Sequence, residues 1–244
     1  MLSTIKFENI LFLDIETVPQ YSSPKELPEP YKKLWGKKSS YFRKEDETAD
    51  DLYWRAGIYA EFGKIICIST GMLGFRNQTP CFRVISFSGD HEENILTDFK
   101  TLLNKVAHRR SVSLCAHNGR EFDFPYIARR MLVNGIELPE ILDVWGKRPW
   151  EIHHLDTMDL WKFGDHKHYT SLELLAALFN IPSPKTDLEG YQVAEVYYKE
   201  KDLHRIVEYC QRDVITIAQL VRRFMGDPLL LEENIEIVKQ QDEE

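Results

Sequence analysis

The alternation of apolar and polar positions along the chain predicts a mixture of strands and helices. Residues 10–13 form an apolar run that is too short for a buried helix and typical of a strand buried on both faces. Similar runs predict strands at residues 64–73, 81–87, 111–116 and 153–156. Apolar residues recur with a helical period in residues 92–108, after Pro125, after Ser171 and in residues 202–225. An early hairpin followed by strands that alternate with helices indicates an α/β sheet.

Two stretches do not fit this alternation. Residues 19–61 carry prolines, lysines and many aromatics, and a loop of this length in a compact domain is usually functional or partly helical. We predict an insertion that packs its own aromatics onto the domain, with a basic and aromatic flap that stacks on substrate bases as the alternative. Residues 229–244 end in polar residues and are predicted to be a frayed tail. Residues 1–228 are therefore predicted to form a single domain.

Composition narrows the class of protein. The chain has 244 residues, 43% of them hydrophobic, and contains no apolar run near the roughly 20 residues of a membrane span. Residues 1–6 do not start a secretory signal, and four cysteines without CxxC spacing read as reduced core residues, so we expect a cytoplasmic protein. The net charge of −8 argues against tight nonspecific binding to long duplex nucleic acid. The histidines lack a recognisable zinc-ligand spacing.

Two carboxylates stand at the end of the first predicted strand. Asp14 and Glu16 are separated by one residue, so both side chains point to the same face of the strand. Two anions held together at the edge of a core repel each other and lose hydration, and a hard divalent cation such as Mg²⁺ compensates both costs. The alternative is a strand that ends in solvent with two exposed acids. Further carboxylates from other segments decide between these two interpretations.

Such carboxylates occur in two further segments. Asp123 follows the predicted strand at 111–116 and precedes a predicted helix, where an aspartate usually acts as a helix cap. Tyr209 and Asp213 are four residues apart on the last predicted helix and border its apolar stripe. Taken alone, such a pair is more often a partly exposed acid beside a packing tyrosine.

In form and order, these segments resemble the DEDD superfamily of 3′-5′ exonucleases. The tyrosine four residues before the last aspartate marks the DEDDy branch, and the resemblance is strongest to the proofreading exonuclease domain of family B DNA polymerases and stand-alone predicted exonucleases. It rests on residues 12–17, 117–123 and 209–213, and extends to 154–156, 171–172 and 181–185. Each motif is weak alone, whereas all three in order are highly specific.

The resemblance implies a ribonuclease H-like fold, a mixed five-stranded sheet flanked by helices. It also implies two Mg²⁺ or Mn²⁺ ions per site. Asp14, Glu16 and Asp213 would hold the ion that activates water, Asp14 would bridge to the second ion, and Asp123 would reach that second ion. Tyr209 would orient the attacking water, because a phenol with an ordinary pKa near 10 is a poor base at neutral pH. The softer part of the resemblance assigns substrate contacts to Thr17, Asn118, Phe122 and Lys185.

The predicted function is a metal-dependent 3′-5′ exonuclease that hydrolyses phosphodiester bonds at the free 3′ end of single-stranded nucleic acid. DNA is favoured over RNA, and an RNA exonuclease stays open because no sequence feature reports on contacts to the 2′-hydroxyl. A nucleic-acid-binding module that keeps the fold without cutting is disfavoured by the complete set of acids. No polymerase domain follows in these 244 residues, so we expect no proofreading in cis. No membrane partner is expected.

Overall fold

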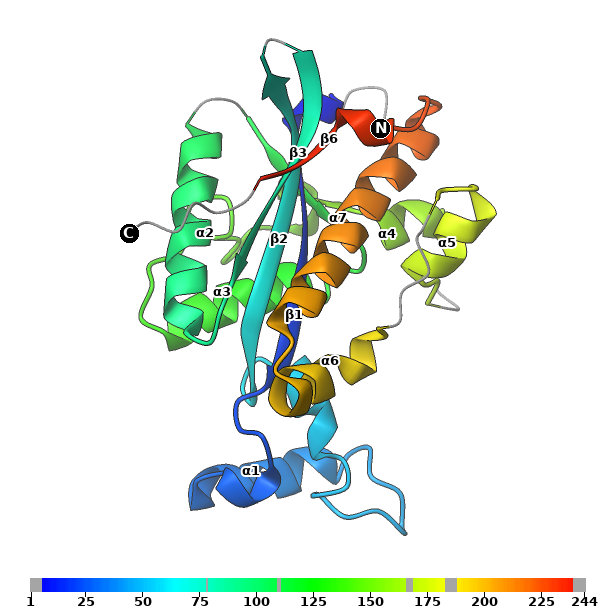
Figure 1. The fold of residues 1–244 in the computed structure, drawn as a ribbon. Helices are drawn as coiled ribbons and strands as arrows, with labels where there is room; N and C mark the ends of the chain where they lie inside the picture. The colour runs from blue at the N-terminus through cyan, green and yellow to red at the C-terminus, as the bar shows by residue number, and fades with distance from the viewer. Residues whose placement is uncertain (1–5, 78, 109–110, 166–168, 183–187, 239–244) are drawn as a thin grey trace.

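The computed structural model describes residues 6–77, 79–108, 111–165, 169–182 and 188–238, and its centre is one mixed β-sheet (Figure 1). The strand order is β5-β4-β1-β2-β3-β6. β1 runs antiparallel to β2 and parallel to β4, β3 runs antiparallel to β2, and β5 and β6 run parallel to β4 and β3. The strands are β1 (Ile10–Pro19), β2 (Gly63–Arg76), β3 (Thr79–Ser88), β4 (Ser113–Ala116), β5 (Leu155–Asp156) and β6 (Ile235–Val238).

Helices cover both faces of this mixed sheet, so the predicted α/β class, a mixed sheet flanked by helices, is confirmed. The helices are α1 (Glu29–Ser39), α2 (Glu92–Ala107), α3 (Asp123–Val133), α4 (Thr157–Lys162), α5 (Leu172–Leu178), α6 (Val193–Glu195) and α7 (Leu203–Met225). Short 3-10 turns are η2 (Phe7–Asn9), η3 (Pro24–Glu26), η4 (Tyr53–Ile58), η5 (Pro149–Glu151), η6 (Gly190–Gln192) and η8 (Glu232–Asn234), and η7 (Val196–Glu200) is a π-helical turn.

The two faces of the sheet have separate apolar cores. Leu11, Leu13 and Ile15 of β1 pack with α2 and α3 on one face, whereas Ile10 and Phe12 pack with α7 on the other. Since side chains alternate along a strand, the even-numbered positions of β1 continue on the α7 face. The local sequence of α7 supports this arrangement, because the helix carries its apolar stripe toward the sheet and is capped by Asp202 and by a glycine with positive φ.

The expected five-stranded sheet has a sixth strand, which lies in the segment predicted to be a frayed tail. β6 pairs with β3, Ile235 opposite Phe82, and Glu236 forms an ion pair with Arg83 at 2.8 Å. The segment has only four residues in a strand and is bordered by acidic residues, so its weak alternation did not stand out from the polar tail. Long-range pairing with an edge strand orders it instead.

Residues 19–61 contain α1 and carry their own small core. Trp35 of α1 is 1% exposed, donates a hydrogen bond to the carbonyl oxygen of Ala49, and packs edge-on against Tyr53 and Phe62. This packing is what the insertion interpretation predicts, and α1 lies beyond the end of β1 (Figure 1). The predicted domain limits stay a prediction.

Two composition-based expectations concern the whole fold. Within the described residues, no helix is long and apolar enough to cross a membrane. The four cysteines are free, buried thiols, as predicted for reduced core residues: Cys67, Cys81, Cys115 and Cys210.

Candidate active site

A cavity of about 750 Å³ collects most of the predicted site residues. Its lining comes from β1, from the loop before α3, from the start of α5, and from α7. The predicted residues that line it are Asp14, Glu16, Asn118, Phe122, Asp123, Tyr209 and Asp213. Segments that lie almost 200 positions apart in the chain, from β1 to α7, therefore meet in one place.

β1 carries the first pair of acids on its α7 face. Glu16 is 7% exposed and Asp14 is half-buried, and Oδ2 of Asp14 has no hydrogen-bond partner among the described residues. The register with β2 shifts directly after Glu16, so Ile66 is an extra residue on β2. Such a bulge twists a strand locally and redirects its side chains. The two acids therefore lie at the end of the regular pairing between β1 and β2.

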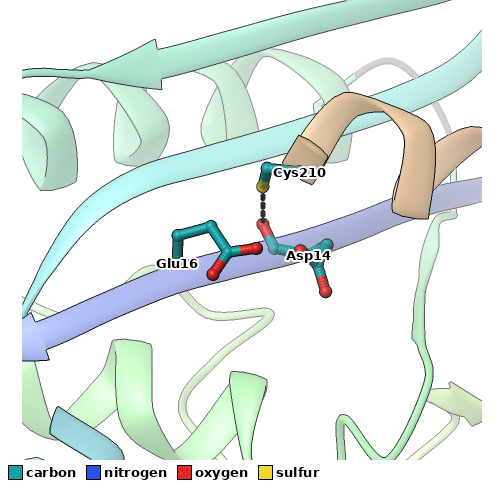
Figure 2. Close-up of side chains that lie close together, drawn as sticks. All are labelled: Asp14, Glu16 and Cys210. Atoms are coloured by element: carbon teal, nitrogen blue, oxygen red, sulfur yellow. Dashed lines mark hydrogen bonds between the residues drawn. The ribbon is translucent and has the colours of Figure 1, made fainter. Parts of the chain in front are cut away.

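Cys210 lies next to this pair and reaches it from α7 (Figure 2). Its Sγ donates a hydrogen bond to the backbone carbonyl oxygen of Asp14 at 3.4 Å, and one potential ligand atom from each of Asp14, Glu16 and Cys210 lies within 4.8 Å of the others. Burial raises the pKa of the Cys210 thiol well above its ordinary value, so at neutral pH it stays a neutral donor. No sequence pattern marks Cys210 as part of the site beyond its place in the apolar stripe of α7.

Another acid, Asp156 of β5, holds the loop that leads to α3. Its carboxylate accepts hydrogen bonds from the backbone N–H groups of Asn118 at 2.9 Å and Arg120 at 3.0 Å, and it also caps α4. Asn118 has a φ of +62°, and a Cβ on Gly119 would lie 2.4 Å from that of Ala116. The tight turn therefore requires this glycine, and it places the Asn118 side chain in the cavity.

Asp123 is the first residue of α3 and is 2% exposed. No side-chain capping bond is present at this helix start, and Oδ1 of Asp123 has no hydrogen-bond partner among the described residues. Burial raises the pKa of Asp123 to about 8, with Asp156 contributing through repulsion. A role as a helix cap therefore does not explain why Oδ1 of Asp123 is buried without a hydrogen bond.

Tyr209 and Asp213 face the cavity from the same side of α7. The tyrosine hydroxyl donates a hydrogen bond to the Asp213 carboxylate, and this bond opposes the effect of burial, which raises the pKa of Asp213 to about 6. Burial also raises the pKa of Tyr209 far above 10, and repulsion by Asp213 adds to this. Tyr209 is therefore a neutral phenol at any physiological pH.

The cavity has a surplus of negative charge. Burial is the largest cause of the raised pKa values of Asp14 and Glu16, and repulsion from the neighbouring carboxylates adds to it. No lysine or arginine is among the described residues that line the cavity. Buried carboxylates with unpartnered oxygens and no cationic side chain match the ligand preference of hard divalent cations such as Mg²⁺ and Mn²⁺. The residues present therefore fit such ions.

We expect the metal-free protein to lose stability as the pH rises from about 4 to about 8. The folded state keeps a proton on Asp123 up to about pH 8, whereas the unfolded chain releases it near 3.8. Between these values the folded state binds more protons, so its free energy of unfolding falls as the pH rises. Urea unfolding in EDTA at a series of pH values measures this slope.

Asp123→Asn is the matched control, since an amide of the same shape cannot release the proton. Its free energy of unfolding is expected to fall less steeply over the same pH range. Equal slopes in the two proteins would contradict a protonated Asp123 in the metal-free fold.

One predicted contact lies outside this cavity. Thr17 follows the bulge and does not line the cavity; its hydroxyl hydrogen-bonds to that of Tyr126. Lys185 lies outside the described residues. Conversely, Tyr169 lines the cavity without having been predicted, with its ring 6.1 Å from that of His117. No motif surrounds Tyr169, so only the folded arrangement identifies it.

A family model described as "Predicted 3'-5' exonuclease related to the exonuclease domain of PolB" matches residues 58–233, which is most of the chain. The chain belongs to this family. The predicted resemblance to family B polymerase exonuclease domains is thereby confirmed. The match includes Asp123, Tyr209 and Asp213 and begins after β1, so Asp14 and Glu16 lie outside it.

Individual relatives of this PolB-like exonuclease domain are distant. A DNA polymerase of Pyrococcus glycovorans is 24% identical over 138 residues, which is 51% of this chain and 17% of the polymerase. The structure of the family B DNA polymerase from the hyperthermophilic archaeon Pyrobaculum calidifontis is 14% identical, with a TM-score of 0.49 over 88% of this chain and 25% of that one. The chain therefore spans a quarter or less of these two polymerases.

Proposed function

We propose that the protein is a metal-dependent 3′-5′ exonuclease that shortens single-stranded nucleic acid from its 3′ end. The observation that carries the proposal is the convergence of Asp14, Glu16, Asp123 and Asp213 in one cavity. Among the described residues, one oxygen each of Asp14 and Asp123 has no hydrogen-bond partner, and no lysine or arginine lines the cavity. Membership in a family of predicted 3′-5′ exonucleases supports the same activity and direction.

The four carboxylates are the residues that would hold divalent cations. Asp14, Glu16 and Asp213 would hold one ion, and Asp14 and Asp123 would hold the other. A pair of Mg²⁺ or Mn²⁺ ions supplies neutralisation of phosphate charge and a lowered pKa of the attacking water. Among the described residues, the acidic side chains that line this cavity repel a phosphodiester, so the cations would be needed to hold the scissile phosphate there and to hydrolyse it.

The remaining residues of the site position the reactants. Tyr209, as a neutral phenol hydrogen-bonded to Asp213, orients the attacking water through its hydroxyl instead of removing a proton. Asn118 and Phe122 face the same cavity from the loop that Asp156 holds rigid, and they contact the terminal nucleotides. Thr17 and Lys185 are kept as substrate contacts only at the level of the family resemblance.

DNA is the proposed substrate, because the relatives found by sequence and by structure are DNA polymerases. An exonuclease acting on RNA is the second candidate. It stays open because Tyr169, which lines the cavity and is 64% exposed, would stack on a base of either nucleic acid. We place the reaction in the cytoplasm, where the four free thiols stay reduced.

Single strands of DNA and RNA, labelled at the 5′ end, test the proposal directly. With Mg²⁺ or Mn²⁺ the protein is expected to shorten the DNA stepwise and release mononucleotides, and EDTA is expected to stop the reaction. A strand blocked by a 3′-phosphate and a circular strand are expected to resist. Efficient cutting of the circular strand would show an endonuclease instead of an exonuclease. No cutting with any metal would favour a nucleic-acid-binding module that does not cut.

A further inference from the structure

A second cavity lies on the other side of the loop that leads to α3. It has a volume of about 240 Å³ and lies between this loop, α3 and residues 142–154. Asn118 and Phe122 of the loop line the active-site cavity, whereas Arg120 of the same loop lines the second cavity. One short stretch of chain therefore forms a common wall between the two.

The two cavities have opposite chemistry. The second cavity has an apolar floor that includes Phe124 and Leu142, with Arg120 and Lys147 at its edge. No carboxylate is among the described residues that line it. Arg120 is held in place by hydrogen bonds to the carbonyl oxygen of His154 at 2.6 and 3.2 Å and by an ion pair with Asp159 at 3.7 Å. This is a local cationic surface on a chain with a net charge of −8.

Two exposed indoles extend this surface. Trp145 is 89% exposed and Trp150 is 69% exposed, and the guanidinium of Arg148 lies 5.3 Å from the ring centroid of Trp150. The loop that carries them is ordered by its acidic residues: Asp143 accepts a hydrogen bond from the backbone N–H of Trp145, and Glu151 one from that of Arg148. These two carboxylates are thus turned to the backbone and cap the turns.

We propose that residues 144–150, together with Arg120, form an accessory surface for the single strand whose 3′ end occupies the active site. We call residues 144–150 the tryptophan loop. The proposal rests on the proposed exonuclease function, since a polymer cut at its end must continue past the wall of the active-site cavity. Bases stack on exposed indoles without regard to sequence, and lysine and arginine bind the phosphates between them.

Nucleic acid is favoured over a peptide as the occupant because of the spacing of functions along the tryptophan loop. Aromatic and cationic residues alternate there, Trp145, then Lys147 and Arg148, then Trp150, which matches the alternation of base and phosphate in a strand. A groove for a peptide would use aromatic residues to bury apolar side chains, whereas Trp145 stands almost fully in solvent.

The test compares Trp145→Ala and Trp150→Ala with Trp54→Ala in the full chain. Trp54 is 56% exposed and lies in the 19–61 segment, so it controls for the loss of any exposed indole. Two measurements are made: the affinity for a fluorescent thymidine oligonucleotide of about 20 residues in EDTA, and the kcat and KM for this strand and for a trinucleotide with Mn²⁺. Base stacking contributes about 5- to 100-fold in affinity per base.

Each variant of the tryptophan loop is expected to weaken binding of the long strand and to raise its KM by about 5-fold or more, with kcat and trinucleotide hydrolysis unchanged. Lys147→Ala with Arg148→Ala is expected to reduce the salt dependence of binding, by about 0.7 in slope per lost phosphate contact. Trp54→Ala is expected to behave as wild type.

If both loop variants have the affinity and KM of the wild-type protein, the accessory surface is overturned. The proposed exonuclease activity would be unaffected, and a peptide would become the occupant to test. A different result would overturn the proposed exonuclease activity: the wild-type protein hydrolyses neither the oligonucleotide nor the trinucleotide, and the loop variants still bind the oligonucleotide more weakly. The tryptophan loop would then stand as a nucleic-acid-binding surface by itself. Equal losses in Trp54→Ala would overturn the assignment to this loop.

Discussion

Asp14→Asn is expected to lower metal-dependent hydrolysis by at least about 10³-fold, because a missing ligand removes several kcal/mol of charge stabilisation in the transition state. The same variant is expected to melt at or above the wild-type temperature in EDTA. Burial and repulsion from Glu16 raise the pKa of Asp14, so a neutral amide of the same shape relieves a cost that the metal-free fold carries. Exonuclease rates and thermal unfolding of the two proteins measure both effects.

The response to Mn²⁺ separates a ligand from a structural residue. A cation that binds only the folded state adds about 1 kcal/mol when its concentration is about five times Kd, which is about 2–4 °C for a chain of this length. Wild type is expected to show this saturable rise, and Asp14→Asn a smaller one. A variant that melts well below wild type in EDTA and still responds fully to Mn²⁺ would make Asp14 structural, with the metal site elsewhere.

The acid cluster could be predicted from the sequence because each acid lies within a strongly patterned element or at its first residue. The apolar run at 10–13 identified β1 as a strand, and the alternation of side chains along a strand placed Asp14 and Glu16 on one face. The period of α7 placed Tyr209 and Asp213 on one side of the helix in the same way. Local periodicity was therefore enough to predict the acid cluster, since every acid projects from a helix or strand or from the first turn of a helix.

Features that depend on long-range contacts could not be predicted in this way. β6 is ordered by pairing with β3, and Cys210 is recognised only when α7 crosses β1. Asp156 serves the site through the backbone of a loop 36 to 38 positions away, and Tyr169 reaches the cavity from a segment without a motif. In each case the relevant partner is distant in sequence, where local patterns carry no signal.

Thr17 shows how far a motif can place a side chain. It directly follows Glu16 in the motif, and regular alternation places it on the α2 and α3 face, opposite to the acids. The bulge after Glu16 shifts its pairing with β2 by one residue, and its hydroxyl contacts Tyr126 in the interior. A residue carried by a motif therefore need not share the cavity of its neighbours.

Tyr209→Phe is expected to lower kcat by about 10²-fold while leaving the affinity for Mn²⁺ close to wild type. The substitution keeps the ring and removes only the hydroxyl that donates to Asp213. Because burial holds Tyr209 as a phenol, the lost function is the orientation of water and not the removal of a proton, so the pH profile of kcat is expected to keep its shape. Single-turnover rates as a function of pH and Mn²⁺ titrations followed by thermal unfolding measure these three quantities.

Asp213→Asn is the comparison that gives this result its meaning. It removes a carboxylate from the ligand group and keeps a hydrogen-bond acceptor for the Tyr209 hydroxyl, so it is expected to lose both Mn²⁺ affinity and nearly all hydrolysis. The phenylalanine variant, in contrast, retains all four carboxylates and a measurable rate. Wild-type single-turnover rates in Tyr209→Phe would remove the tyrosine from the mechanism, and a matching loss of Mn²⁺ affinity in both variants would make its hydroxyl a support for the Asp213 ligand instead.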